Sequence, residues 1–244
     1  MNKKFVLTET TKEFFGTTLY QIKAVRSFAD IEEGELGGFI EKESNLDHDG
    51  DAWVYGNARV YGNARVYGNA QVSGNARVYG DAQVYGNAQV SGNARVYGNA
   101  WVYGNARVSG DAQVSGDAQV SGNARVYGNA RVYGNAWVSG DAQVSGDAQV
   151  SGNAQVYGDA RVQTCKHVAW FSSVGSENGT LTAYMIKTGE IEVTRGCFRG
   201  TLEEFESAVQ QQHGDTQHGQ EYLLLIQFIK VRFKEVKVEI EESA

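Results

Sequence analysis

Residues 66–80 read VYGNAQVSGNARVYG, and residues 84–98 repeat these 15 letters without a change. The two copies are offset by 18 residues, which is three times a shorter unit of six. Glycine recurs at every sixth position from Gly50 to Gly158, 19 times in all, and an alanine and a valine keep the same step. A fixed period of this kind indicates a repeat architecture before any single strand is assigned.

Each six-residue unit contains a strand and a corner. The unit reads Ala, then Arg, Gln or Trp, then Val, then Tyr or Ser, then Gly, then Asn or Asp. Successive side chains of a strand point to opposite faces, so Ala and Val share one face and the variable pair shares the other. Gly adopts positive φ without steric cost, and Asn or Asp tolerate it better than most residues. The last two positions therefore predict a corner.

Two architectures fit a four-residue strand followed by a two-residue corner. A meander of hairpins would leave every Ala/Val row on one open face. A coil of constant hand closes that face inward and stacks equivalent rows at about 4.8 Å. The sequence therefore predicts a mainly β fold in which residues 50–162 form a triangular solenoid of 18-residue coils, about six in number.

The Val-x-Gly-Asn/Asp-Ala-x hexads resemble the left-handed β-helix of the hexapeptide-repeat superfamily, which includes acyltransferases and gamma-class carbonic anhydrases. The left-handed sense is implied by this resemblance only. Residues 20–54 (YQIKAVRSFADIEEGELGGFIEKESNLDHDGDAWV) resemble the N-terminal cap of bacterial and phage proteins labelled hexapeptide transferases. Residues 174–184 (VGSENGTLTAY) and 196–218 (GCFRGTLEEFESAVQQQHGDTQH) resemble a C-terminal module of uncharacterised phage and prophage proteins.

The period ends on both sides of the solenoid, which predicts three domains. Residues 1–49 are expected to form a β cap that pairs with the first coil, with strands at 4–9, 14–26 and 36–41. Such a cap keeps an open solenoid end from aggregating.

Residues 163–244 are expected to form a small α+β domain. Its strands are expected at 167–174, 180–187 and 190–195. Thr201 with Glu204 makes a capping box that starts a helix running to about Gln212. A second helix is expected over 221–234, with an apolar stripe of Leu224, Ile226, Phe228 and Ile229.

The solenoid lacks the residues that the related enzymes use. Hexapeptide acyltransferases are known for a histidine base beside a cleft between subunits, and gamma-class carbonic anhydrases for three histidine ligands. Residues 50–162 contain no His, Cys, Glu or Lys, and no loop interrupts a hexad. We expect no catalytic residue, metal or cofactor there. An acyltransferase stays an alternative carried by the resemblance, with His48 or His167, which flank the coil, as its base.

The C-terminal part holds the other candidates for chemistry. Cys197, His213, Asp215 and His218 supply a thiol, imidazoles and a carboxylate, and Cys197 lies just before an expected helix start. The favoured interpretation is structural: a turn between helices around His213 and His218, and two buried, reduced thiols at Cys165 and Cys197.

The 18-residue period assigns every outward side chain to one of three sides. The first, the Arg/Tyr side, carries Arg59, Arg77, Arg95 and Arg131 with Tyr61, Tyr79, Tyr97 and Tyr133. The second, the Trp side, carries Tyr67, Tyr85, Trp101, Tyr103, Trp137 and Tyr157. The third carries Gln71, Ser73, Gln89, Ser91, Gln143 and Ser145, for which no role is expected.

The two aromatic sides suggest contact surfaces. Stacked arginines are mildly unfavourable in water and become favourable when an anionic partner lies across them. Repeat duplication without selection would also produce such a ladder. Exposed aromatic residues in a stripe are typical of a protein interface, so we expect a homo-oligomer, a trimer or dimer, formed through the Trp side.

These features favour a non-enzymatic binding or scaffold protein, phage- or prophage-encoded by resemblance, whose solenoid is a rigid spacer. One alternative is a counter-defence protein that sequesters an anionic ligand or a host protein. The net charge is −7, but the repeat is near neutral, with eight arginines and seven aspartates, which argues against a DNA mimic. No apolar run of about 18 residues and no signal-peptide core is present. The expected location is the cytoplasm, with no membrane partner.

Overall fold

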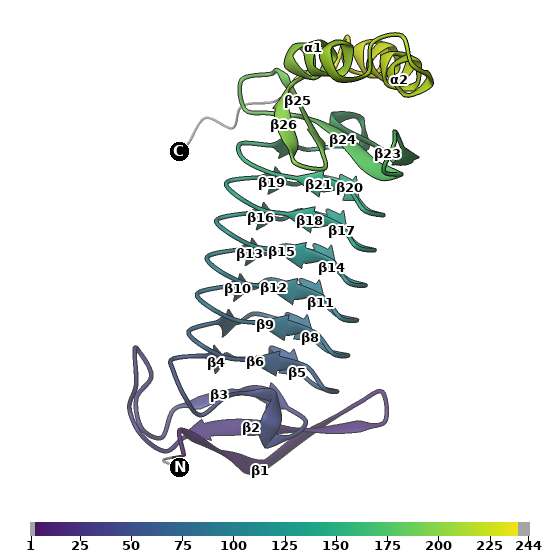
Figure 1. Cartoon of the computed structure of the whole chain (residues 1–244). Helices are drawn as coiled ribbons and strands as arrows, with labels where there is room; N and C mark the ends of the chain where they lie inside the picture. Colours follow the sequence, from purple (N-terminus) through teal and green to yellow (C-terminus); the bar gives the residue numbers. More distant parts are fainter. Residues whose placement is uncertain (1–2, 239–244) are drawn as a thin grey trace.

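The computed structural model describes residues 3–238, which form a β-solenoid covered at both ends (Figure 1). Each hexad contributes one two-residue strand, made of the variable residue and the valine that follows it. These strands are β4 (Trp53–Val54), β5 (Arg59–Val60), β6 (Arg65–Val66), β7 (Gln71–Val72), β8 (Arg77–Val78), β9 (Gln83–Val84), β10 (Gln89–Val90), β11 (Arg95–Val96), β12 (Trp101–Val102), β13 (Arg107–Val108), β14 (Gln113–Val114), β15 (Gln119–Val120), β16 (Arg125–Val126), β17 (Arg131–Val132), β18 (Trp137–Val138), β19 (Gln143–Val144), β20 (Gln149–Val150), β21 (Gln155–Val156) and β22 (Arg161–Val162).

The strands stack into three parallel sheets, one for each side of a triangular coil. Arg59 pairs with Arg77, and Val60 pairs with Val78, so the register advances by 18 residues. The sheets run β3-β5-β8-β11-β14-β17-β20, β4-β7-β10-β13-β16-β19-β22 and β6-β9-β12-β15-β18-β21, the first extended by β2 and β1. The predicted solenoid and its coil length are confirmed. Its left-handed sense stays an inference from resemblance.

Alanine and valine fill the interior of the solenoid. Every hexad Ala from Ala52 to Ala160 and every hexad Val from Val54 to Val162 is fully buried. Outside this core, side-chain amides form ladders along the corners. Nδ2 of Asn87 donates to Oδ1 of Asn105, 3.1 Å away, and the next rungs continue in the same direction. A ladder ends where Asp replaces Asn, because a carboxylate accepts hydrogen bonds but cannot donate one.

The N-terminal segment adds a coil that the hexads do not predict. It contains β1 (Phe5–Phe14), β2 (Thr17–Ala24), β3 (Leu36–Ile40) and the short helix η1 (Glu43–Asn45). β3 pairs in parallel with β5, and Leu46 bridges to Val66. Residues 36–54 thereby complete one further turn, which gives about seven turns where the hexads predict about six.

The expected first strand is too short. β1 continues to Phe14 because a register shift between Leu7 and Thr11 carries its pairing with β2 through a polar stretch. That stretch, TETTKE, lacks the apolar alternation by which a half-buried strand is recognised. β1 and β2 therefore form a hairpin that reaches sideways from the base of the solenoid (Figure 1).

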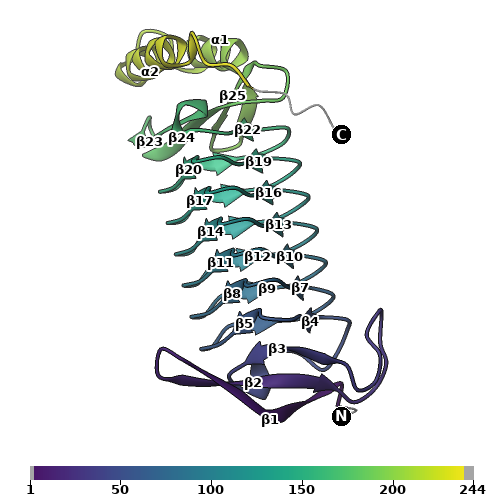
Figure 2. The ribbon, with the colours of Figure 1, turned by 180° about the vertical axis from the view of Figure 1, so that it is seen from behind.

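The C-terminal segment packs on the other end of the solenoid. It contains the short helix η2 (Cys165–His167), then β23 (Val168–Val174), β24 (Gly179–Met185), β25 (Ile191–Arg195) and β26 (Phe198–Thr201), which form one antiparallel sheet. Two helices, α1 (Leu202–His213) and α2 (Gln217–Phe233), follow (Figure 2). The three expected strands and the first helix are confirmed, whereas β26 is an addition.

Both helices begin at a threonine cap. Thr201 Oγ1 accepts the Glu204 N–H and the Glu204 carboxylate accepts the Thr201 N–H, which is the expected capping box. The second helix begins four residues earlier than expected because Thr216 caps it.

The expected apolar stripe of α2 is half wrong. Ile226 and Ile229 are fully buried, whereas Leu224 is 67% exposed and Phe228 is 52% exposed. Residues two apart project about 200° apart around a helix, so these two pairs cannot share one face. No helix of the described residues is long and apolar enough to cross a membrane.

The last coil is closed by β24 and β25. The Tyr184 side chain is fully buried and belongs to the same apolar core as the solenoid valines. Thr182 Oγ1 accepts the Gln155 N–H at 3.0 Å, and Thr194 Oγ1 donates to the Gln155 carbonyl at 3.1 Å. Side chains thus satisfy main-chain groups that an additional coil would otherwise pair.

Candidate functional site

The Arg/Tyr side lies on the sheet that contains β5 to β20. Arg59, Arg77 and Arg95 stand in register on three successive coils. The ring of Tyr79 stacks between Tyr61 and Tyr97, with centroids 5.0 Å apart on both sides and rings within 3° of parallel. Burial raises the pKa of Tyr61 and Tyr79, so both rings are neutral beside the arginines.

The hairpin between β1 and β2 covers the first rungs of this side. The Arg59 and Arg77 guanidinium carbons lie 4.4 and 4.9 Å from the centroid of the Phe14 ring. The edge of Phe14 also meets Tyr61 at 5.7 Å. Both contacts are typical of cation–π and edge-to-face aromatic packing.

Higher on the same side, the predicted binding residues are uncovered. Arg95 and Arg131 are exposed, as is Tyr133. Among residues 3–238, no carboxylate lies within ion-pair distance of the four arginines of this side. The surface therefore offers unpaired positive charge next to flat aromatic rings.

The Trp side lies on the sheet of β6 to β21. The rings of Tyr67, Tyr85 and Tyr103 stack in sequence at 4.8 and 5.1 Å. Trp101 meets the Tyr85 ring edge-on at 6.5 Å. Its indole is 40% exposed.

The second indole of this side is held more firmly. Trp137 meets the Tyr157 ring edge-on at 5.6 Å, and its Nε1 donates to Ser121 Oγ at 3.3 Å. It is 38% exposed. The six aromatic residues of the Trp side thus share one sheet, as predicted, and both indoles present apolar surface to solvent.

The third side carries the expected Gln and Ser residues, with one addition. Arg107 and Arg125 pair on adjacent coils of this sheet, and both are exposed. Sequence reasoning passed over them because glutamine and serine dominate the neighbouring rungs.

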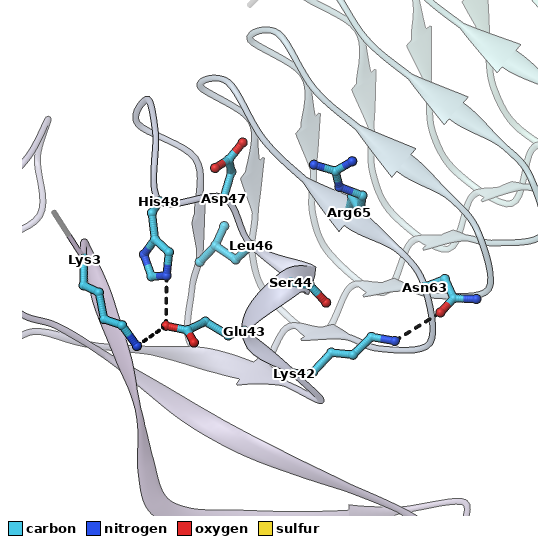
Figure 3. A pocket seen from close by; sticks show the side chains of 9 residues that line it. All are labelled: Lys3, Lys42, Glu43, Ser44, Leu46, Asp47, His48, Asn63 and Arg65. Carbon is cyan, nitrogen blue, oxygen red and sulfur yellow. Dashed lines mark hydrogen bonds and ion pairs between the residues drawn. The ribbon is translucent and has the colours of Figure 1, made fainter. Parts of the chain in front are cut away.

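A pocket lies at the N-terminal end of the solenoid, where the cap meets the first hexads (Figure 3). It has a volume of about 920 Å³ and is lined by Lys3, Lys42, Glu43, Ser44, Leu46, Asp47, His48, Asn63 and Arg65. The Lys3 ammonium lies 2.6 Å from the Glu43 carboxylate, and His48 Nε2 lies 3.0 Å from the same oxygen. The hydrogen bond from Lys3, followed by that from His48, lowers the pKa of Glu43.

His48 supports the cap through both ring nitrogens. Its Nδ1 accepts the Lys4 main-chain N–H at 3.1 Å, its Nε2 faces Glu43, and its ring stacks on Phe5 at 4.4 Å. A general base needs a lone pair directed at the substrate, and both nitrogens of this ring are occupied. The sequence gave no signal for this pocket, because its residues come from segments of different periodicity.

His167, the other histidine beside the coil, is also engaged. Its Nδ1 accepts the Thr164 N–H at 3.2 Å, and its Nε2 donates to the Lys237 carbonyl at 2.9 Å. It joins η2 to the segment after α2. The two histidines on which the acyltransferase alternative depends therefore both make structural contacts.

Both cysteines differ from expectation. Cys165 and Cys197 are free and exposed, not buried. Cys197 lies in the turn between β25 and β26, where its side chain points away from the sheet's packed face, and β26 separates it from α1. The small size of cysteine suggested burial, but a turn at a sheet edge has no second layer to cover it.

The histidines of the C-terminal part flank a turn between helices, as expected. His213 ends α1, Gly214 has φ of 50°, and His218 lies in the first turn of α2 with its ring centroid 6.3 Å from that of His213. Within residues 3–238, no three His, Cys, Asp or Glu side chains are grouped to hold a metal ion.

Comparison with known proteins finds two matches, both on the repeat. Residues 77–169 match the family described as "Bactofilin: Polymer-forming cytoskeletal", which is less than half of the chain. Residues 52–68 and 58–71 match the YdcK β-solenoid repeat. No curated protein matches the chain. With the three-sided coil described above, these matches identify the repeat as a member of the β-helix superfamily.

Proposed function

We propose that this protein is a non-enzymatic scaffold that associates side by side through the Trp side. The observation that carries the proposal is the uninterrupted solenoid, whose interior from Ala52 to Val162 is filled by alanine and valine at zero exposure. Such an interior leaves no room for a substrate, and corners without loops build no active-site cleft. The description of bactofilins as polymer-forming supports this role by similarity.

The solenoid is suited to act as a stiff spacer. One apolar core runs from Phe5 through all the coils to Tyr184. Main-chain hydrogen bonds and amide ladders join every coil to the next. About seven coils at about 4.8 Å spacing give a rod of roughly 30 Å.

Association through the ends of the solenoid is blocked. The β1–β2 hairpin and β3 cover the first hexad coil, and β24 with Tyr184 covers the last (Figures 1 and 2). Copies of the chain therefore have to meet along their sides. On the Trp side, Gln119 lies between Trp101 and Trp137, so the two indoles project two coils, about 9.6 Å, apart.

The apolar surface of the two indoles is large enough to matter. An exposure of 40% leaves about 100 Å² of a tryptophan side chain in water. At about 25 cal/mol per Å², burial of each indole contributes about 2.5 kcal/mol, or about 10 kcal/mol for the four indoles of a two-fold dimer. Association itself costs about 4–15 kcal/mol, so the stacked tyrosines around the indoles also have to contribute.

The test is the oligomeric state of the full chain. Gln is the natural residue at the equivalent positions Gln83, Gln119 and Gln155, so Trp101→Gln with Trp137→Gln should preserve the coil. We expect this variant to weaken self-association at least 100-fold in sedimentation equilibrium. Leu224→Gln, at an equally exposed apolar position on α2, is the matched control. A wild-type chain that is monomeric at all concentrations tested, or a double variant that associates as before, would refute the proposal.

A further inference from the structure

Phe15 occupies the tip of the β1–β2 hairpin in an unfavourable position. Phe14 pairs with Thr17, which leaves Phe15 and Gly16 as a two-residue loop, with φ of 48° and 79°. Positive φ at both positions is typical of a type I′ turn, for which Asn-Gly is the favoured pair. A bulky side chain in this conformation is an outlier, and such outliers concentrate where a side chain serves a contact.

The Phe15 side chain also lies outside the fold. It is 89% exposed, and it meets only the edge of the neighbouring Phe14 ring, at 4.6 Å. Phe14 points back onto the solenoid, so the next side chain along the strand points away from it. Neither turn geometry nor packing within this chain explains a phenylalanine at this position.

The Arg/Tyr side already binds a phenylalanine ring from the same hairpin. Arg59 and Arg77 lie over Phe14, and Tyr61 packs against its edge. The 18-residue repeat presents the same pair of side chains again at Arg95 with Tyr97 and at Arg131 with Tyr133. We call these two pairs the free rungs. They continue the surface that Phe14 occupies, since Arg95 pairs with Arg77 in the sheet.

The charges of the hairpin complement the free rungs. Glu9 and Glu13 are exposed on β1, and Glu13 stands beside Phe14 at the tip. Lys12 is held by its own chain, because its ammonium lies over the Phe39 ring at 3.9 Å and donates to Asn57. The tip therefore presents an aromatic ring and a carboxylate to a surface of unpaired arginines and tyrosine rings.

We propose that Phe15 of one copy docks on a free rung of the Arg/Tyr side of a second copy, with the guanidinium over the ring and Glu13 beside it. The donor is at the base of one solenoid and the acceptor is higher on the next, so the contact is heterologous and generates a staggered, open assembly. It extends the proposed scaffold role but uses a different surface, and it does not depend on the Trp side.

The experiment separates the two contacts by working in the Trp101→Gln, Trp137→Gln chain. Phe15→Asn removes the donor ring, and Asn favours the same turn, so the fold is retained. Arg95→Gln with Arg131→Gln removes the acceptor, and Gln is natural on this sheet at Gln113 and Gln149. We expect each variant to weaken the remaining self-association at least tenfold, measured by sedimentation velocity over a concentration series. Unchanged melting temperatures would show that both variants fold.

Mixing supplies the decisive result. The Phe15→Asn chain keeps the acceptor and the doubly substituted arginine chain keeps the donor, so an equimolar mixture should form one-to-one pairs although neither chain associates alone. A mixture that stays monomeric overturns the proposal, as does a Trp-free chain that is monomeric before any further change; the latter result leaves the Trp-side contact intact. Conversely, association that survives the loss of both tryptophans but is lost with Phe15→Asn refutes the Trp side and retains this contact. If the arginine substitutions reduce binding to heparin but not self-association, the free rungs serve an anionic ligand and the proposal is wrong.

Discussion

The corners of the solenoid should fail by crowding between coils more than by backbone strain, and two glycines allow the two causes to be measured apart. Gly98 has φ of 70°, and a Cβ there would lie 3.0 Å from the Gly116 nitrogen and 3.1 Å from its oxygen. Gly56 has φ of 56°, and a Cβ there would have no heavy atom within 4 Å. Gly98→Ala and Gly56→Ala therefore share the conformational cost and differ in the steric one.

The shared cost is small. Placing an L residue in the left-handed region costs about 1–2 kcal/mol, and replacing Gly lowers the entropy of the unfolded chain, which offsets about 0.4–1 kcal/mol. We expect Gly56→Ala to lower the free energy of unfolding by about 1 kcal/mol.

The steric cost falls on main-chain atoms that cannot move aside. The Gly116 oxygen accepts the Asn99 N–H at 2.8 Å, so displacing it weakens a hydrogen bond between coils worth about 1 kcal/mol. Overpacking a close-packed position costs about 1–3 kcal/mol. Gly98→Ala should therefore lower the free energy of unfolding by about 2–4 kcal/mol.

Urea unfolding followed by circular dichroism measures both changes. Because each coil contacts only its neighbours, the Gly98→Ala transition is also expected to broaden or divide near the altered corner. Equal losses in the two variants would refute the reasoning, since the close approach of Gly98 to Gly116 would then contribute nothing.

Two further predictions concern the ends of the solenoid. Burial lowers the pKa of Lys4 to about 8, so between pH 8 and 10.5 the unfolded chain binds more protons than the native one, and stability rises with pH by up to about 1.4 kcal/mol per unit; urea unfolding between pH 7.5 and 9.5 should show this rise, and Lys4→Met should abolish it, whereas identical slopes in both proteins would contradict the assignment. Tyr184→Phe removes a hydrogen bond of 2.5 Å to the Glu192 carboxylate, which Arg199 also holds at 2.7 Å, and should lower stability by about 1.5–3 kcal/mol; a loss below 0.5 kcal/mol in the same assay would show that this bond does not stabilise the C-terminal cap.

The repeat could be predicted from the sequence because its information is local. A glycine every sixth residue sets the corners, alternation along the strand sets which side chains face inward, and an exact copy 18 residues away sets the coil. The register of Arg59 on Arg77 and the grouping of Trp101 with Trp137 on one sheet follow from counting alone. The Thr201 capping box was predictable for the same reason, since its two partners lie three residues apart.

Contacts between segments of different periodicity were decided only by the tertiary structure. The coil at residues 36–54 has no hexad, and it forms because β3 finds the open edge of β5. Phe14 covers Arg59 because a register shift lets β1 extend to the tip of the hairpin, which no pattern in its polar sequence indicates. Exposure of Leu224 likewise depends on which face of α2 meets the sheet. A local pattern fixes backbone conformation and the facing of side chains, whereas burial depends on which distant segment arrives to cover them, and that is settled by the free energy of the whole packed chain.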